Sequence, residues 1–347
     1  MTAALRFLSP GLSTTVQDLG RPGFQRLGVG LGGALDPVSL NAANFLVGNP
    51  GNAGALEVLY VGPTFVVEAD EARLSFVGAD AKIEILAGID ARDGEVVAPM
   101  RSILVRRGQV VRVGSLRNSA TLYIAVEGGF AIEPMLGSVS TDSRSKMGGW
   151  QGRALVAGDV LPLRRSVATD LDESCIDGLD LTPPRRVRVI SGPQSDYFSQ
   201  AEIERFFASE YAVSAGSNRM GMRLEGVPIR HRRGFNIISD AIATGSVQVP
   251  GNGQPIVLLA DHQTTGGYPK IATVISADLP AIGRLQIGSK ISFEPITLEE
   301  AALARRKLAA DLEEIRKKIV RITPGSDVVA ARLLECNLIS GVCNAAA

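Results

Sequence analysis

Residues 256–275 read IVLLADHQTTGGYPKIATVI, and this stretch indicates how the rest of the chain folds. A run of apolar residues stands at each end, over residues 256–260 and 271–275. Short apolar runs that are rich in β-branched residues and bounded by turn residues are typical of buried strands. The polar residues 261–270 are therefore predicted to form a loop held at both ends by a rigid core, which is where binding and catalytic groups concentrate.

The loop gathers many groups that can bind a ligand or exchange a proton. It contains Asp261, His262, Gln263, Thr264, Thr265, Tyr268 and Lys270. Gly266 and Gly267 allow backbone amides to approach a ligand closely, because neither residue carries a Cβ. The alternative is a polar hairpin whose side chains satisfy only its own backbone.

We assign candidate roles to side chains of the loop and of segments near it. Asp240, His262 and Lys270 are candidate catalytic groups, since a histidine exchanges protons near neutral pH. Gln263 and Tyr268 could orient a carbonyl or a urea-like group, and Lys270 with Arg219 could hold a carboxylate or a bicarbonate-derived anion. The full set of candidate substrate-binding residues is Gln263, Thr264, Gly267, Tyr268, Arg219, Asn218 and Gln248.

Composition excludes several classes of protein. The 36 basic and 36 acidic residues balance and form no run of like charge, which argues against nucleic acid or an anionic membrane as the main partner. No apolar segment approaches the ~20 residues that span a bilayer. Residues 1–9 lack the apolar core of a signal peptide, and Cys175, Cys336 and Cys343 have no metal-ligand spacing. We therefore expect a reduced, cytoplasmic protein.

Several catalytic devices are not found in the sequence. There is no phosphate loop of the Gly-x4-Gly-Lys-Ser/Thr type and no Gly-x-Ser-x-Gly elbow. With 2 distant histidines and no cysteine cluster, a structural zinc site is not expected. If ATP or biotin takes part in the reaction, we expect a partner chain to supply much of that machinery.

The chain divides into four segments. Residues 1–165 are predicted to be a β-rich module, and residues 187–296 a second one. Between them, residues 166–186 are acidic and contain Pro183-Pro184, which indicates a linker. Residues 297–347 are predicted to be a helix and a tail. A turn glycine precedes an alternating strand at Gly108, Gly158 and Gly288, and this recurrence suggests related β-barrel-like modules, although three short matches could be chance.

Three helices have clear start signals. Asp36 before Pro37 is a capping residue, Ser199 begins a capping-box pattern, and Thr297 with Glu300 begins another. The last helix carries an apolar face and is expected to pack on the barrel or on a partner protein. The glycine-rich residues 28–33 could bind an anion before the first helix, but turn glycines are the commoner explanation.

Several segments together resemble one family. They are residues 14–23, residues 32–37, residues 217–221 and residues 254–270. The chain is identified, from about residue 5 to about residue 296, as a member of the family of 5-oxoprolinase C subunits, also called biotin-dependent carboxyltransferase or allophanate hydrolase subunit 2. The resemblance implies a mainly β fold of cyclophilin-like barrel modules with a C-terminal amphipathic helix. It also implies a complex with two partner chains, which resemble the A and B subunits of 5-oxoprolinase and are called the A-type and B-type partners below.

The resemblance implies two enzymatic functions. One is ATP-dependent cleavage of 5-oxoproline to glutamate, and the other is transfer of carboxylate from carboxybiotin to urea or a related small amide. In the carboxyltransferase setting, the matching positions Asp240, His262, Gln263, Tyr268 and Lys270 are similar to a substrate-handling group. A third hypothesis, from a different class, is a non-catalytic regulator that binds another protein through its barrel surface.

Overall fold

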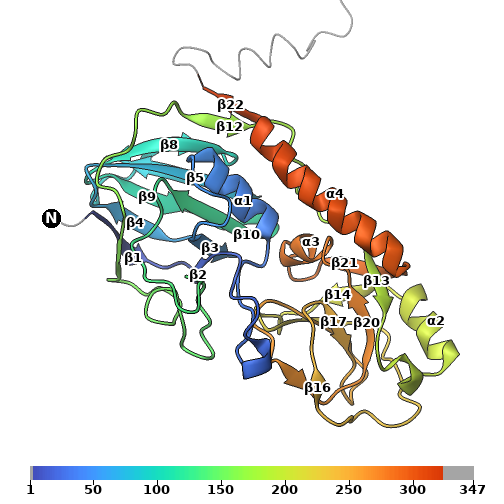
Figure 1. Ribbon diagram of the computed structural model, residues 1–347. Coiled ribbons are helices and arrows are strands. Elements are labelled where there is room, and N and C mark those ends of the chain that lie inside the picture. The colour runs from blue at the N-terminus through green and yellow to red at the C-terminus, as the bar shows by residue number, and fades with distance from the viewer. Residues whose placement is uncertain (1–2, 323–347) are drawn as a thin grey trace, which may run out of the picture.

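Two β modules lie side by side in the computed structural model, which describes residues 3–322 (Figure 1). The first packs a six-stranded sheet against a seven-stranded sheet, and the second is a closed seven-stranded barrel. The prediction of a mainly β chain with a few helices and a barrel is confirmed. Cys336, Cys343 and the predicted tail from residue 323 lie outside the described residues.

The first module is built from strands whose limits follow the sequence pattern closely. The six-stranded sheet runs β11 (Val160–Pro162), β1 (Ala4–Ser9), β4 (Thr64–Val67), β9 (Val110–Val113), β6 (Ile83–Leu86) and β7 (Gly94–Val97). The seven-stranded sheet runs β2 (Ser13–Gln17), β3 (Ala55–Leu59), β10 (Arg117–Val126), β5 (Glu71–Asp80), β8 (Arg101–Arg106), β12 (Ser174–Ile176) and β22 (Ile319–Arg321). Every pairing in these two sheets is antiparallel.

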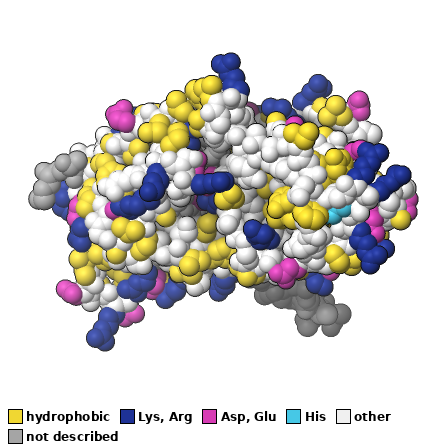
Figure 2. All heavy atoms as spheres, turned by 90° about the horizontal axis from the view of Figure 1, so that it is seen from below, with side chains coloured by type: hydrophobic (Ala, Val, Ile, Leu, Met, Phe, Trp, Pro, Cys, Tyr) yellow, Lys and Arg dark blue, Asp and Glu magenta, His cyan; other side chains and the backbone are white. Residues whose placement is uncertain are grey.

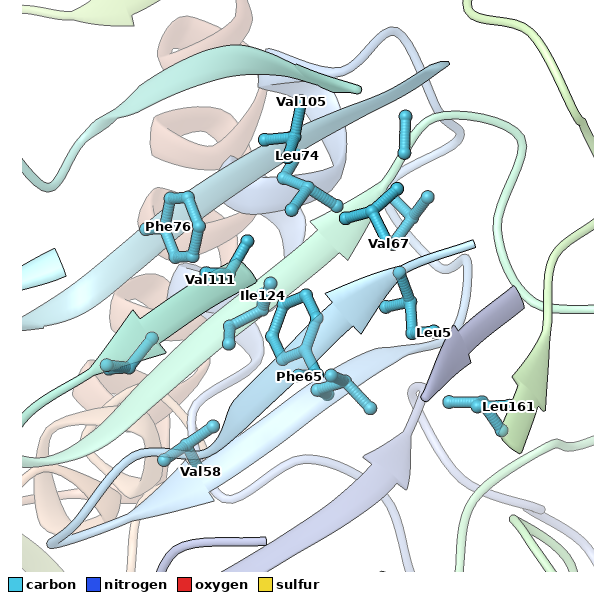
Figure 3. Close-up of a cluster of buried hydrophobic side chains, with 14 of the residues drawn as sticks. Leu5, Val58, Phe65, Val67, Leu74, Phe76, Val105, Val111, Ile124 and Leu161 are labelled. Carbon is cyan, nitrogen blue, oxygen red and sulfur yellow. The ribbon is translucent and has the colours of Figure 1, made fainter. Parts of the chain in front are cut away.

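The core of the first module lies between its two sheets. Phe65 and Val111 from the six-stranded sheet meet Leu74, Phe76 and Ile124 from the seven-stranded sheet (Figure 3). Alternate residues of a strand point to opposite faces, so one face of each sheet is apolar and faces the other sheet. This packing fixes the outer edges from which the loops of the module extend.

The barrel closes through parallel pairing of β13 with β21, while its other pairings are antiparallel. Its order is β13 (Arg186–Ser191), β20 (Lys270–Val274), β17 (Ser246–Gln248), β18 (Ile256–Leu258), β15 (Gly221–Glu225), β14 (Tyr211–Val213) and β21 (Lys290–Pro295). A small ribbon of β16 (Asp240–Ala241) and β19 (Thr265–Gly266) lies outside the barrel. The barrel core includes Phe206 of α2 (Gln200–Ala208) stacked on Phe293.

The predicted helix starts are confirmed. Asp36 accepts bonds from two backbone N–H groups at the start of α1 (Pro37–Leu46), and Ser199 caps α2. Thr297 and Glu300 form a full capping box at the start of α4 (Leu298–Lys317). The remaining helical elements are α3 (Leu279–Gly283), η1 (Gln25–Leu27) and η2 (Ser195–Tyr197). No helix among residues 3–322 is long and apolar enough to cross a membrane.

The C-terminal helix returns the chain to the first module. Ile315 of α4 is buried in the cluster that covers the outer face of the seven-stranded sheet, and Arg316 lies over the ring of Phe45 in α1. The strand β22 then pairs with β12, which the segment predicted as a linker contributes. The expectation that the apolar face of this helix packs on the barrel is wrong for the C-terminal half of α4, because that half packs beside α1 (Figure 1).

Candidate functional site

The loop 261–270 connects β18 to β20, as the two apolar runs predicted. Within the loop, β19 pairs with β16 in a register that sets Asp240 opposite Gly266. Lys270 is the first residue of β20 and lies on the barrel wall. The structure thus brings Asp240 and Lys270, which are 30 residues apart in sequence, to one edge of the barrel.

Asp240 and Lys270 form an ion pair in which only one partner is exposed. Lys270 Nζ lies 2.8 Å from Asp240 Oδ2 and also donates to the carbonyl oxygen of Ala241 at 3.2 Å. The Lys270 side chain is 2% exposed, whereas that of Asp240 is 49% exposed. The hydrogen bond from Lys270, followed by one from Gln194, lowers the pKa of the Asp240 carboxyl. The Asp240 carboxyl is therefore ionised at neutral pH.

Gln194 ties the pair to the barrel. Its Nε2 donates to Asp240 Oδ2 at 3.1 Å, and its Oε1 accepts from the backbone N–H of Lys270 at 3.3 Å. One amide therefore contacts both partners and limits their relative movement. Gln194 carried no signal in the sequence, since it follows β13 in a Gly-Pro turn 76 residues before Lys270.

Gln248 and Lys270 are register partners on β17 and β20. The register shifts between Val247 and Gln248, and both side chains reach the β16–β19 ribbon, Lys270 at Asp240 and Gln248 beside Gly266. Gln248 is 2% exposed, and its Nε2 has no hydrogen-bond partner among the described residues. A Cβ built on Gly266 would lie 2.6 Å from that nitrogen, so a larger residue at this position would displace the amide. An unpaired buried donor is costly, which marks this position as a place for an acceptor atom.

His262 is buried and lies in a different set of contacts. Its Nε2 lies 3.0 Å from Thr244 Oγ1, and its Nδ1 lies 2.6 Å from the carbonyl oxygen of Gln263. Burial lowers the pKa of His262, against opposing effects of the Gln263 carbonyl and of Asp261. The ring is therefore neutral at pH 7 and fixes the start of the loop. Among the described residues it has no hydrogen bond to Asp240 or Lys270.

The other predicted loop residues face different surroundings. The carbonyl oxygen of Thr264 accepts from Ile242 N at 3.0 Å, and that of Gly267 accepts from Ile237 N at 2.9 Å. Tyr268 is exposed. Asn218 accepts from Met220 N at 2.9 Å in a turn at the module interface. Substrate-binding roles for these residues, and for Gln263, stay predictions.

Arg219 joins the two modules. Its Nε and Nη2 donate to the two carboxylate oxygens of Asp261 at 2.8 Å each, and Nη1 forms an ion pair with Glu57 of β3. Nη2 also donates to Gly33 O at 2.6 Å. Burial alone would lower the pKa of Arg219, but the carboxylates of Glu57 and Asp261 outweigh it and raise the pKa. Each of its three side-chain nitrogens thus contacts an oxygen of the chain itself.

Glu57 is bonded in turn to Tyr123 of β10. The hydroxyl of Tyr123 donates to Glu57 Oε2 at 2.5 Å and accepts from Asp36 N at 2.8 Å. Burial, and then the charges of Glu57 and Asp36, raise the pKa of Tyr123 well above its usual value. Because Asp261 precedes His262, this buried network anchors the start of the site loop to the first module. Neither Glu57 nor Tyr123 carried a signal in the sequence.

Two loops of the first module reach the same region. Gly32 N donates to Ala260 O at 3.1 Å, and a Cβ on Gly30 would lie 3.5 Å from His262 O and 4.0 Å from Asp142 Oδ2. Positive φ angles at Gly28, Gly32 and Gly33 agree with turn glycines. The segment over residues 28–33 therefore lies between the site loop and the polar loop over residues 137–152. No group of three or more potential metal ligands occurs within residues 3–322.

Comparison with known proteins identifies the family to which this architecture belongs. Residues 27–295 match the family model described as "Carboxyltransferase domain, subdomain A and B". The chain belongs to this carboxyltransferase-domain family. It is 38% identical to the C subunit of 5-oxoprolinase from Haemophilus influenzae over 87% of this chain and 94% of that protein. It is 36% identical to the C subunit of 5-oxoprolinase from Escherichia coli over 90% and 97% of the two chains.

A solved structure from this carboxyltransferase-domain family shares the fold. The urea carboxylase of Kluyveromyces lactis superposes with a TM-score of 0.79 and 27% identity, covering 93% of this chain. The match covers 30% of the urea carboxylase chain, so the present chain spans less than a third of that protein. By contrast, it spans nearly the whole length of the two bacterial relatives.

Proposed function

We propose that this chain is one component of an ATP-dependent 5-oxoprolinase complex, which cleaves 5-oxoproline to L-glutamate together with the A-type and B-type partners. Two relatives that are named as the C subunit of 5-oxoprolinase align along 94% and 97% of their length. Their similarity to this chain therefore extends over the whole protein and not over one domain of a larger enzyme. It supports a role as one member of a multi-chain complex.

The observation that carries the chemical part of the proposal is the adjacent placement of two uncommitted donors. A lysine ammonium has three N–H donors, and Lys270 uses two of them on Asp240 and Ala241. Gln248 is the register partner of Lys270, and its Nε2 makes no hydrogen bond among the described residues. The two side chains can therefore both donate to one oxygen atom placed between them and Gly266.

That oxygen is the lactam carbonyl oxygen of 5-oxoproline in the proposed reaction. Phosphoryl transfer from ATP to this oxygen releases ADP and activates the carbonyl carbon. One water adds there and the C–N bond breaks, which frees the amine and leaves an acyl phosphate. A second water then hydrolyses the acyl phosphate to glutamate and inorganic phosphate. Lys270 and Gln248 would orient the oxygen for phosphoryl transfer and stabilise the negative charge of the phosphoryl group once it is bound there. Asp240 and Gln194 would hold Lys270 in place, so that little reorganisation is needed during the reaction.

Reconstitution tests the proposal. The chain is mixed with purified A-type and B-type partners from the same source, and glutamate release from 5-oxoproline is measured with and without ATP. We expect release only when all three proteins and ATP are present. Lys270→Met should lower kcat by about 10²–10³-fold, as is typical when one donor to a developing oxyanion is removed. Lys290→Met, at an exposed ion pair with Glu210, is the matched control and should keep full activity. Absence of release from the complete wild-type mixture would refute the proposed activity.

Carboxyl transfer to urea or a related amide is the alternative function. It is favoured by the description of the family model and by the match to the K. lactis urea carboxylase. In that case biotin would be carried by a partner, and Lys270 with Gln248 would hold the carbonyl oxygen of urea. Carboxybiotin on a carrier protein, supplied with urea, should then yield a carboxylated product in the absence of 5-oxoproline. Glutamate release without any carboxyl transfer would reject this alternative.

A further inference from the structure

The segment between β15 and β16 carries apolar side chains into solvent. Ile238 is 94% exposed, Phe235 is 46% exposed, and Tyr268 of the site loop is 39% exposed. Ile237 N donates to Gly267 O at 2.9 Å, which sets Ile238 next to the segment that carries Tyr268. The ring of Phe235 lies 6.3 Å from that of His231, whose Nε2 is 2.9 Å from Val249 O. Single exposed apolar residues are common, but a group of large ones on one loop is not.

The same segment between β15 and β16 also carries basic residues. Arg230 and Arg232 are exposed, and their side chains have no carboxylate partner among residues 3–322. The neighbouring acidic residues are already paired. Asp196 contacts Arg233, Asp240 contacts Lys270, and Glu202, which accepts from Arg230 N, contacts Arg205. The surface is therefore net positive, although the whole chain carries a formal charge of 0. Figure 2 shows hydrophobic side chains beside Lys and Arg at the barrel end of the lower face.

We propose that this surface, made of Phe235, Ile238, Tyr268, Arg230 and Arg232, is the docking patch for a partner protein that presents acidic residues around an apolar pocket. Aromatic and arginine side chains, with a large apolar anchor, are the groups that dominate binding at protein interfaces. The positive rim selects an acidic partner and accelerates the encounter. The inference rests on the proposed function for the identity of that partner, which is another chain of the complex.

The position of the docking patch explains why its occupation would affect the reaction. The patch segment ends in Asp240, and its backbone is bonded to the site loop at Gly267. Asp240 is half-exposed in the isolated chain, so water reaches one side of the Asp240–Lys270 pair. A partner seated on Ile238 would cover Asp240 and exclude that water. Electrostatic interactions strengthen when water is removed, so docking would complete the site.

The test compares three variants of the full chain. Ile238→Asp removes the apolar anchor, and Arg232→Glu reverses one charge of the rim. Leu303→Asp is the matched control, because Leu303 is 62% exposed and belongs to α4, outside the segment that carries the patch and outside the site loop. Since all three positions face solvent, circular dichroism should show an unchanged fold. Binding of each variant to the purified A-type and B-type partners is measured by calorimetry at low and high salt.

We expect Ile238→Asp to weaken binding to one of the two partners by at least about 10-fold. Arg232→Glu should weaken it as well and should reduce its salt dependence, whereas Leu303→Asp should bind as the wild type does. Equal binding by Ile238→Asp and wild type, or no wild-type binding to either partner, would overturn the docking patch. So would binding of the wild type to anionic phospholipid vesicles that Ile238→Asp abolishes, because a membrane would then be the occupant.

The docking patch and the proposed activity can be refuted independently of each other. Glutamate release by the wild-type mixture, with no effect of Ile238→Asp on binding or rate, would refute the docking patch and keep the oxoprolinase function. Patch-dependent binding without glutamate release would keep the docking patch and refute that function.

Discussion

Replacing Arg219 by Met should destabilise the protein strongly and uncouple its two modules. The side chain of Arg219 is 11% exposed, and its partners Glu57 and Asp261 are 0% and 8% exposed. Methionine retains the apolar volume but leaves two buried carboxylates without their cation. Removing one member of a buried ion pair costs about 3–5 kcal/mol, because the remaining charge is uncompensated. That is a large share of a typical free energy of unfolding of about 5–15 kcal/mol.

Two spectroscopic probes can follow this effect separately. The chain has 1 tryptophan, Trp150, and it packs on the core of the first module. Far-UV circular dichroism reports both modules together. In guanidinium titrations of the wild type, we expect the two signals to change together. In Arg219→Met, both midpoints should fall, and the two transitions should separate because the link from Glu57 to Asp261 is lost.

Two further variants decide whether the reasoning is right. Arg107→Met, at an exposed pair with Asp70, should cost less than about 1 kcal/mol. Adding Glu57→Gln to Arg219→Met should recover part of the loss, because it removes one of the two uncompensated charges. A loss below about 1 kcal/mol in Arg219→Met, with coincident transitions, would refute this network as a strong link between modules and leave the buried Arg284–Asp36 pair as the candidate.

Three other changes have defined outcomes. Burial lowers the pKa of His262 in the folded chain below its ordinary 6.5, so the unfolded chain binds a proton at a higher pH than the folded chain does. The free energy of unfolding should therefore fall as pH falls below 6.5. His262→Gln should flatten this pH dependence, which urea titrations would measure. Gly149→Ala would place a Cβ 1.8 Å from Thr141 Oγ1 at a φ of +53°, and thermal melting should show a larger loss than for Gly23→Ala, where φ is +94° but space is open. Thr297→Ala should cost about 1 kcal/mol and fray α4, which circular dichroism would detect; no change would mean that the capping box contributes nothing.

Local features of the fold were predictable from the sequence. The strands predicted over residues 256–260 and 271–275 correspond to β18 (Ile256–Leu258) and β20 (Lys270–Val274). The caps at Asp36 and Thr297 were also predicted, because a capping residue bonds to backbone within its own first turn. These features depend on contacts between residues close in sequence.

The composition of the site was less predictable, because it depends on contacts between distant residues. The register of β16 on β19 brings Asp240 to the loop, and the turn after β13 brings Gln194 to Asp240. No periodicity or spacing in the sequence encodes such a pairing. The loop as a region was predicted, but the separation of His262 from the Asp240–Lys270 pair appears only in three dimensions.

The pairing of β12 with β22 gives the chain the topology of a domain insertion. Ile176 and Ile319 are register partners in one sheet, and the whole barrel lies between them in sequence. The chain therefore leaves the first module, which is the host, after β12 and returns to it at the neighbouring strand β22. A short hairpin turn between these two residues would excise the barrel and leave the host sheet with an unbroken strand order. A barrel exchanged at this junction would still have to supply a cation for Glu57 and an apolar cover in place of Ile315, because both contacts reach into the first module.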